Sequence, residues 1–322
     1  MEISPCPLCS AADATIVRSR LRYGIKRKVF RCRLCQMVYL ERPQEIEKFY
    51  GGTSYRATYG PTLGKKSNSK EVFNTYRPYQ QPIIDRLRPI LRKNMKVLDV
   101  GCSTGHFLDA LKGKVKTRVG LELSRDEVSF IRKNLDFPVY SEPIKHIKIK
   151  EGPFDLITCF QVLEHIEDPQ SFLKALGKNL KPGGYLYLEL PNINDVLLRV
   201  YEIEEYEDFY FREPHLSYFS AATLKKMLKK TGFVGRMGTA QGYNIIKHMH
   251  WLSARKPQGN FTLGNGIPAL VRGSKSKTAA GAALNAFIAR ADREYKTVLE
   301  KHGLGESLTF LGKKNKKRAT TP

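Results

Sequence analysis

The chain has 322 residues, enough for one large domain and a smaller one, and 41% of them are hydrophobic, which suffices for a packed core. Lysine and arginine number 55 against 31 aspartates and glutamates, and this net charge of +24 favours polyanionic partners such as RNA or an anionic membrane surface. No run approaches 18 uninterrupted apolar residues and the N-terminus lacks a secretory signal pattern, so the sequence predicts no membrane span and a cytoplasmic location.

Four of the six cysteines form two C-x-x-C pairs at residues 1–40, Cys6 with Cys9 and Cys32 with Cys35. Each pair can turn both sulfurs toward one point, and four thiolates in a tetrahedron suit zinc. A unit of about 40 residues buries too little surface to fold alone, and a metal supplies the missing stability. We therefore predict a zinc ribbon whose closed site is structural, followed by a connector rich in tyrosine and glycine at residues 41–75.

Residues 97–107 read V-L-D-V-G-C-S-T-G-H-F, an apolar strand followed by a glycine-punctuated loop that opens a helix. Gly101 and Gly105 are expected where the chain turns tightly and where a ligand comes close to the backbone. The loop is not a Walker phosphate loop, because no G-K-[ST] follows. Its G-x-x-x-G spacing also differs from the G-x-G-x-x-G dinucleotide fingerprint.

Further strands alternate with helices after this loop. Residues 119–123 predict a second strand ending in the acid Glu122, and residues 154–160 predict a third. A helix then ends at K-P-G-G, and residues 185–190 predict a fourth strand. This order indicates an α/β fold, a Rossmann-like parallel sheet with helices on both faces and ligands at the carboxyl ends of its strands.

Four motifs in register resemble the class I S-adenosylmethionine-dependent methyltransferases: V-L-D-V-G-C-S-T-G-H-F, G-L-E-L-S, F-D-L-I-T-C-F-Q-V-L-E-H-I-E-D-P and L-K-P-G-G-Y-L-Y-L-E-L-P-N. The resemblance covers residues 76–240, and it departs from the family at Ser103, where glycine is usual. It implies a methyltransferase domain over residues 76–313 that binds S-adenosylmethionine. Serine is small and tolerates turns, so we expect Ser103 to reduce backbone freedom without abolishing binding.

The expected cofactor residues follow from the same alignment of motifs. Asp99 is expected to orient the loop or the methionine amino group, and Glu122 to accept from the ribose hydroxyls with Leu123 packed on adenine. Glu142 is either a partner of the adenine amino group or a surface acid. The remaining expected cofactor contacts come from Gly101, Ser103, Gly105, Phe160 and Gln161.

Candidate proton acceptors lie beside the expected methyl position. A sulfonium donor is already activated, so a base is needed only for a hydroxyl or carbon-acid acceptor. His165, which follows Glu164, is either that base or a locally hydrogen-bonded helix-start residue. His215 either reaches the same cleft or fixes its loop to the core. Some quinone O-methyltransferases carry an acid where this chain has Gln161, which argues against a catalytic metal.

A ribbon, a tyrosine-rich connector and this core together resemble a bacterial subfamily that modifies sugars, and the block P-H-L-S-Y-F-S extends the resemblance. The resemblance implies a carbohydrate acceptor, free or nucleotide-linked, methylated at oxygen or carbon. It also implies that Tyr50, Tyr55 and Tyr59 form a cofactor lid, the alternative being a solvated linker. Residues 191–220 are an insertion beyond a strand end, where the acceptor pocket is expected.

The C-terminal part and the charge leave further alternatives. Residues 252–301 predict an excursion made of a loop and an amphipathic helix from 278 to 301, and residues 308–311 predict an antiparallel strand inserted near the sheet edge. Residues 314–322 predict a disordered basic tail. The basic surface keeps open two alternatives to a small acceptor, an RNA methyltransferase and a non-catalytic module that binds RNA or a partner.

Overall fold

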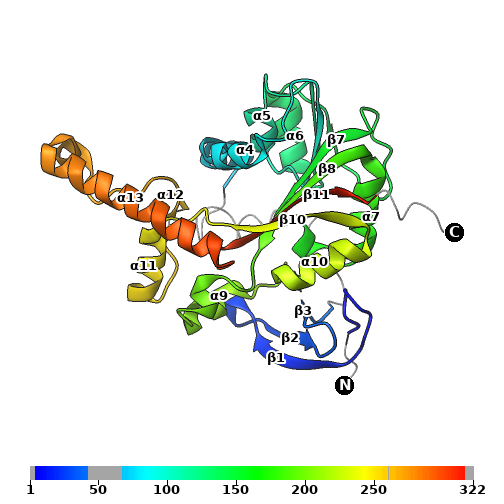
Figure 1. The fold of residues 1–322 in the computed structure, drawn as a ribbon, viewed down its shortest axis with the longest axis horizontal. Helices are drawn as coiled ribbons and strands as arrows, with labels where there is room; N and C mark the ends of the chain where they lie inside the picture. Colours follow the sequence, from blue (N-terminus) through cyan, green and yellow to red (C-terminus); the bar gives the residue numbers. More distant parts are fainter. Residues whose placement is uncertain (1–3, 43–66, 260, 316–322) are drawn as a thin grey trace.

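A computed structural model describes residues 4–42, 67–259 and 261–315 of the chain. Two sheets organise these residues: a seven-stranded sheet flanked by helices, and a four-stranded sheet close to the N-terminus (Figure 1). Residues 43–66, with the three tyrosines expected in a lid, lie outside the described residues.

The seven-stranded sheet has the architecture expected from the sequence. Its strands are β4 (Lys96–Val100), β5 (Thr117–Leu121), β6 (Val139–Tyr140), β7 (Phe154–Phe160), β8 (Leu180–Pro191), β10 (Phe233–Ala240) and β11 (Ser307–Lys314). The order is β10-β11-β8-β7-β4-β5-β6, with β8, β7, β4, β5 and β6 parallel. β11 is antiparallel to both β8 and β10, which confirms the inserted strand and the α/β class.

Some helices of the described residues flank the faces of this sheet, whereas others project away from it or pack beside the ribbon (Figure 1). The helices are α3 (Ser69–Tyr76), α4 (Gln81–Leu87), α5 (His106–Ala110), α6 (Arg125–Asn134), α7 (Pro169–Asn179), α8 (Val196–Arg199), α9 (Glu204–Tyr210), α10 (Ala221–Lys230), α11 (Ile245–Ala254), α12 (Phe261–Gly264) and α13 (Ala279–Lys301). Short 3-10 turns are η1 (Arg22–Gly24), η2 (Arg77–Tyr79), η3 (Leu163–His165) and η4 (Gly273–Lys277). Successive strand residues enter different cores, as Val97 and Leu98 do, because side chains alternate across a strand.

Sequence signals explain where several helices begin and end. Asp168 caps α7 by accepting from the Ser171 amide, and Pro169 occupies the first helical position, where no donor is needed. Ser220 and Thr223 form a capping box at the start of α10. Gly232, at a φ of +86°, lies after that helix and before β10.

The four-stranded sheet joins the ribbon to the expected insertion. Its order is β1 (Ala14–Arg20), β2 (Lys26–Cys32), β3 (Val38–Leu40) and β9 (Ser217–Tyr218). β9 belongs to the segment 191–220, and it pairs antiparallel with β3 through Val38 opposite Tyr218. The backbone amide of Leu40 adds a 3.0 Å hydrogen bond to the Leu216 carbonyl. The ribbon is thus completed by a strand from the methyltransferase-like part of the chain.

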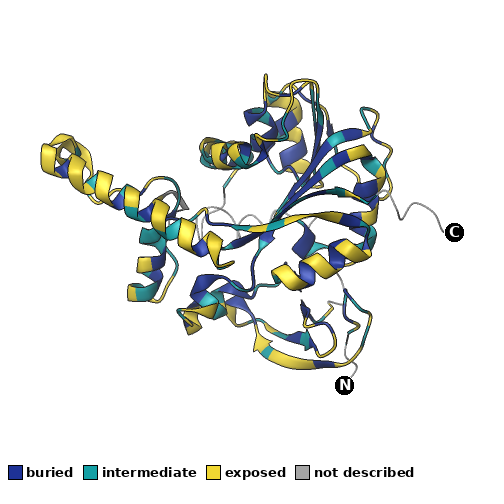
Figure 2. Cartoon of the chain, viewed as in Figure 1, coloured by how far each residue is buried: buried dark blue, intermediate teal, exposed yellow. Residues whose placement is uncertain are grey.

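Several segments differ from the sequence expectations. α3 occupies the end of the expected connector. α11 begins before the excursion predicted at residue 252, and α12 lies within the part of that excursion that was expected to be a loop. β11 continues through Lys314, so the basic run expected to be disordered from that residue begins inside the sheet. The long helix expected from 278 is present as α13. Figure 2 shows that its outer half is largely exposed, whereas the central strands are buried.

Candidate active site

The loop between β4 and α5 is tied to the neighbouring strand. The amides of Gly101 and Cys102 donate to the Leu121 carbonyl at 2.8 and 3.1 Å. Asp99 is buried under this loop and accepts a 2.7 Å hydrogen bond from the Thr158 hydroxyl. Burial raises the pKa of Asp99 to about 8. The structure therefore places Asp99 as an inner support of the loop rather than an exposed anion.

Glu122, at the end of β5, holds the other side of the loop. Its carboxylate accepts from the backbone amides of Ser103 at 2.8 Å, Leu123 at 2.8 Å and Ser124 at 2.9 Å. A carboxylate has about four lone-pair sites, so one more donor can be accommodated. Leu123 is 49% exposed beside it, an open apolar face of the kind an adenine ring would cover. These features fit a nucleoside with ribose hydroxyls, whereas Glu142 is exposed and has no described contact.

Packing explains the glycines of this loop. A Cβ on Gly101, which has a φ of +75°, would approach Val162 Cγ2 within 2.3 Å. On Gly105, at +76°, it would approach the Phe137 ring within 2.7 Å. Both glycines are therefore required by neighbouring side chains of the protein, a reason that the sequence analysis did not give. Ser103 adopts a φ of +52°, the left-handed region that the usual glycine would enter without strain.

The end of β7 lies next to this loop. Phe160 packs edge-on against Phe107, with 4.8 Å between ring centroids, and against Tyr187 at 5.6 Å. Gln161 has a φ of +54°, and its side-chain amide donates to the Ser307 hydroxyl at 3.3 Å. The left-handed turn at Gln161 redirects the chain from the strand into η3, which carries Glu164 and His165.

The three expected catalytic residues lie together. His165 Nε2 is 3.7 Å from Glu164 Oε1, and His215 Nε2 is 4.0 Å from the same oxygen. The two imidazole rings meet edge to face at a centroid distance of 4.8 Å. Glu164 comes from η3, whereas His215 comes from the segment 191–220, so the cluster forms only when the insertion packs on the end of β7. The arrangement agrees with both readings of His215, because this histidine both fixes its loop and reaches the cleft residues.

Hydrogen bonds assign the tautomers in this cluster. His165 Nδ1 lies 2.8 Å from the Pro214 carbonyl oxygen, so Nδ1 carries the hydrogen and Nε2 is the basic nitrogen. Arg212 Nε donates to His215 Nε2 at 2.8 Å. No sequence signal indicated a role for Arg212 or Pro214, although both lie in the segment 191–220 and Pro214 opens the block P-H-L-S-Y-F-S.

Burial sets the charges of the cluster. It raises the pKa of Glu164 to about 8, and no described residue is within hydrogen-bond distance of either carboxylate oxygen. Burial and the Arg212 guanidinium lower the pKa of His165 to about 3 and that of His215 well below 6.5. At neutral pH both imidazoles are therefore uncharged. The side chain of His165 is 12% exposed against 1% for Glu164, so His165 is the more accessible of the two.

The four ribbon cysteines converge as their spacing predicted. Their sulfurs lie within 4.8 Å of one another, with 3.5 Å between Cys6 and Cys35 and between Cys9 and Cys32. Tetrahedral zinc with Zn–S bonds of 2.3 Å requires sulfurs about 3.8 Å apart. The donor set and its spacing thus fit a closed Cys₄ zinc site.

A family model described as a methyltransferase domain matches residues 73–236, about half of the chain and the part that contains the loop, Glu122 and η3. This chain belongs to the methyltransferase-domain family. The ubiquinone biosynthesis O-methyltransferase of Thiobacillus denitrificans is 30% identical over 182 residues, 53% of this chain and 77% of that protein. The protein of the same name from Hydrogenovibrio crunogenus is 25% identical over 174 residues, 51% and 72% of the two chains.

Solved structures resemble the methyltransferase as well. A SAM-dependent methyltransferase from Archaeoglobus fulgidus aligns over 75% of this chain and 99% of its own, with 18% identity and a TM-score of 0.47. From its family, the methyltransferase is an enzyme that uses S-adenosylmethionine, which overturns the non-catalytic alternative. In the described part of the chain, no helix combines the length and apolarity needed to cross a bilayer.

Proposed function

We propose that this methyltransferase transfers a methyl group to an acceptor atom of a small molecule that must lose a proton, and that the acceptor is a carbohydrate, free or nucleotide-linked. The O-methyltransferase names of its relatives support a small hydroxyl acceptor. The ribbon, the connector and the P-H-L-S-Y-F-S block, which resemble a sugar-modifying subfamily, support the carbohydrate class. The observation that carries the proposal is the buried cluster of Glu164, His165 and His215.

The cluster supplies a route for the proton. S-adenosylmethionine provides a methyl group already activated on a sulfonium, so alignment and proton removal remain for the protein. His165 Nε2 takes the proton as the acceptor oxygen bonds to the methyl carbon and the carbon–sulfur electron pair stays on sulfur. Above a pH of about 8, where Glu164 is ionised, its carboxylate oxygen 3.7 Å from His165 Nε2 stabilises the imidazolium that forms. Arg212 positions His215 against the same carboxylate.

The cofactor roles belong to this proposal too. Glu122 accepts one ribose hydroxyl on its remaining lone pair, and Leu123 covers one face of the adenine. The methionine part of the cofactor lies against backbone atoms of Gly101, Ser103 and Gly105, in the loop that Asp99 supports from below. The transferred methyl group lies beside Phe160 and Gln161. Glu142 is the candidate partner of the adenine amino group. The four ribbon cysteines hold zinc in a structural role.

The test is methyl transfer from isotopically labelled S-adenosylmethionine to separate panels of nucleotide-linked sugars, phenols and RNA, followed by mass spectrometry. Labelled sugar supports the full proposal. If only a phenol is labelled, the mechanism for a small-molecule acceptor stands and the carbohydrate acceptor is rejected. If only RNA is labelled, the small-molecule acceptor and the carbohydrate class are both rejected. Glu122→Ala should bind the cofactor much more weakly, and equal binding would reject the ribose role.

His165→Ala tests the base. General-base catalysis contributes about 10²–10⁴-fold, so kcat should fall by at least about 100-fold while cofactor affinity is retained. His146→Ala, which changes an exposed histidine, is the matched control and should keep full activity. Full turnover by His165→Ala on a hydroxyl acceptor would reject His165 as the proton acceptor.

A further inference from the structure

An arm made of residues 263–290 extends from the main sheet. It comprises the end of α12, the segment through η4 and the outer half of α13, and Figure 1 shows it reaching away from β10 and β11. Within the arm, the Asn285 side chain joins the segment to the helix: its oxygen accepts from the amides of Leu270 and Val271 at 2.9 Å, and its amide donates to the Val271 carbonyl at 2.9 Å. The arm is therefore a folded element rather than a trailing loop.

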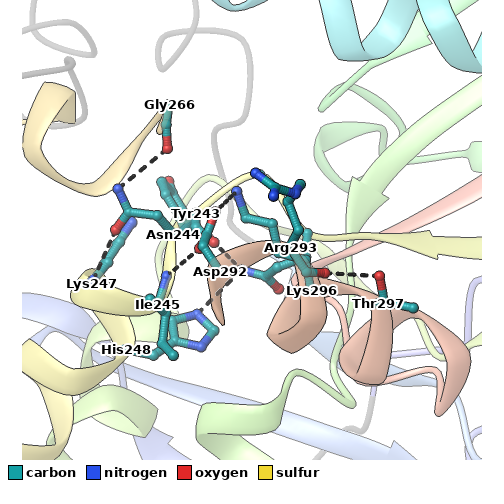
Figure 3. A network of polar contacts seen from close by, with 12 residues as sticks. Tyr243, Asn244, Ile245, Lys247, His248, Gly266, Asp292, Arg293, Lys296 and Thr297 are labelled. Atoms are coloured by element: carbon teal, nitrogen blue, oxygen red, sulfur yellow. Dashed lines mark hydrogen bonds and ion pairs between the residues drawn. The ribbon is translucent and has the colours of Figure 1, made fainter. Parts of the chain in front are cut away.

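A polar network fixes the base of the arm (Figure 3). Asp292 of α13 accepts from the Ile245 amide at 2.7 Å. His248 Nδ1 lies 2.7 Å from the Tyr295 hydroxyl. The Asn244 amide donates to the carbonyl of Gly266 at 3.5 Å and to that of Leu263 at 3.2 Å. Because α11 and α13 are tied by these bonds, the outer half of α13 is held clear of the sheet.

Large apolar side chains are exposed along this fixed arm. Ile267 is 82% and Phe287 54% exposed, and Leu270 and Leu284 are about half exposed. On α13, the exposed residues Ala280, Ala283, Leu284 and Phe287 recur at the spacing of one helix face, and Figure 2 shows the outer half of the helix largely exposed. Several such residues on one projecting element mark an interaction surface rather than scattered surface apolars.

The charge around this surface has one sign. Residues 255–290 contain no aspartate or glutamate. The stretch carries six cations, Arg255, Lys256, Arg272, Lys275, Lys277 and Arg290, of which the last four lie in the arm and Arg255 is paired with Glu205 at 3.7 Å. Pairing the arm with that of a second copy would bring two such cationic sets together at a cost. RNA would satisfy the cations and leave the apolar face exposed. A surface with anionic groups above an apolar layer matches both features.

We propose that the arm docks this methyltransferase on an anionic lipid bilayer, with Leu284, Phe287, Ile267 and Leu270 entering the interface. Amphipathic segments of this composition lie in the plane of the interface, where cations contact acidic headgroups and apolar residues reach the acyl boundary. The arm is too short and too polar to span, so it rests on the surface. This inference does not depend on the identity of the methyl acceptor.

The test is sedimentation of the 322-residue chain with vesicles of phosphatidylcholine alone and of phosphatidylcholine with 30% phosphatidylglycerol. The protein should bind the anionic vesicles and not the neutral ones. The variant Leu284→Gln/Phe287→Gln should bind the anionic vesicles at least about tenfold more weakly. Each large apolar side chain that moves fully from water into the bilayer interface should increase the binding constant by more than about tenfold. The matched control Val234→Gln/Val298→Gln changes two exposed valines outside the arm and should bind like the unmodified protein.

Three results would overturn the proposal. The first is failure of the 322-residue chain to bind anionic vesicles. The second is equal vesicle binding by the arm variant, which would assign binding to charge elsewhere, including the basic ribbon. The third is a concentration-dependent dimer without vesicle binding that Leu284→Gln/Phe287→Gln dissociates, which would make a second copy the occupant. Because the four substituted residues are exposed, equal melting temperatures should accompany all comparisons.

Discussion

Glu164 is a buried carboxyl group without a hydrogen-bond partner among the described residues. Its pKa is raised from 4.5 to about 8, so the folded protein binds a proton that the unfolded chain releases at lower pH. The sign follows from linkage: the folded state is favoured below pH 4.5, and this contribution is lost as pH rises through 8. The raised pKa of Asp99 acts in the same direction.

Glu164→Gln removes this titration while keeping the shape of the side chain. We expect the variant to match the unmodified protein near pH 5 and to exceed its free energy of unfolding near pH 9 by on the order of 4 kcal/mol. Denaturant unfolding at the two pH values measures this difference, with the exposed Glu167→Gln as control. If the effect of Glu164→Gln were the same at both pH values, the carboxyl would have an ordinary pKa.

Ser103 is strained by its φ of +52°, because a side chain in the left-handed region meets its own backbone. Ser103→Gly should raise the free energy of unfolding by about 1 kcal/mol. The substitution relieves the strain of the left-handed conformation, and the greater entropy of glycine in the unfolded chain offsets part of this gain. Thermal unfolding without cofactor measures the change. The control Ser129→Gly, inside α6, should instead lower the free energy of unfolding by about 0.5–1 kcal/mol. Destabilisation by Ser103→Gly would show that the serine side chain has a compensating role.

Among the elements, the pairing of β3 with β9 links the cysteine cluster to the loop that carries His215. Removing zinc should loosen β1, β2 and β3, and then β9 and the proposed catalytic cluster of Glu164, His165 and His215, so both stability and turnover should fall. Hydrogen exchange read by mass spectrometry should show lost protection at residues 216–219, with residues 154–160 of β7 as the protected reference. Restored zinc should restore both readings. Unchanged exchange at 216–219 after complete zinc removal would contradict the coupling.

The elements that sequence predicted are those with local signals. β4 and β7 are apolar runs of strand length, and α13 has apolar residues at helical spacing, so local periodicity was enough to predict them. β9 has two residues and exists because β3 offers an edge to it, a contact that no window of sequence contains. α11 was missed because its apolar, histidine-rich sequence packs through Trp251 into a core formed with the ribbon and insertion.

The site divides in the same way. The positions of Asp99 and Glu122 beside one loop could be predicted because each lies at the end of a predicted strand, and parallel strands end at a common edge. Arg212 was missed because its role depends on the tertiary contact with His215. Gly101 and Gly105 were singled out because a ligand was expected to come close to the backbone there. In the structure, Val162 and Phe137 leave no room for a Cβ at these two positions.

At the scale of the whole molecule, the net charge of +24 works against compactness. Screening shortens from about 30 Å at 0.01 M salt to about 8 Å at 0.15 M, so repulsion between distant cations weakens. We therefore expect the free energy of unfolding to rise over this range of sodium chloride and then to level off. A steady fall would mean that attractive ion pairs such as Lys181 with Asp155 outweigh the repulsion. Sodium chloride suits the measurement better than sulfate, which stabilises proteins by exclusion.

The pairing of β3 with β9 also has a consequence during synthesis. The ribbon strands emerge first, but Ser217 and Tyr218 follow about 180 residues later, which at 5–20 residues per second is roughly 10–35 s of translation. Throughout that interval β3 lacks its β9 neighbour, and unpaired strand edges recruit other chains. Early capture of zinc would keep the nascent ribbon compact while its last strand is still being made. Expression in zinc-poor medium should accordingly yield aggregated chains more than inactive soluble ones.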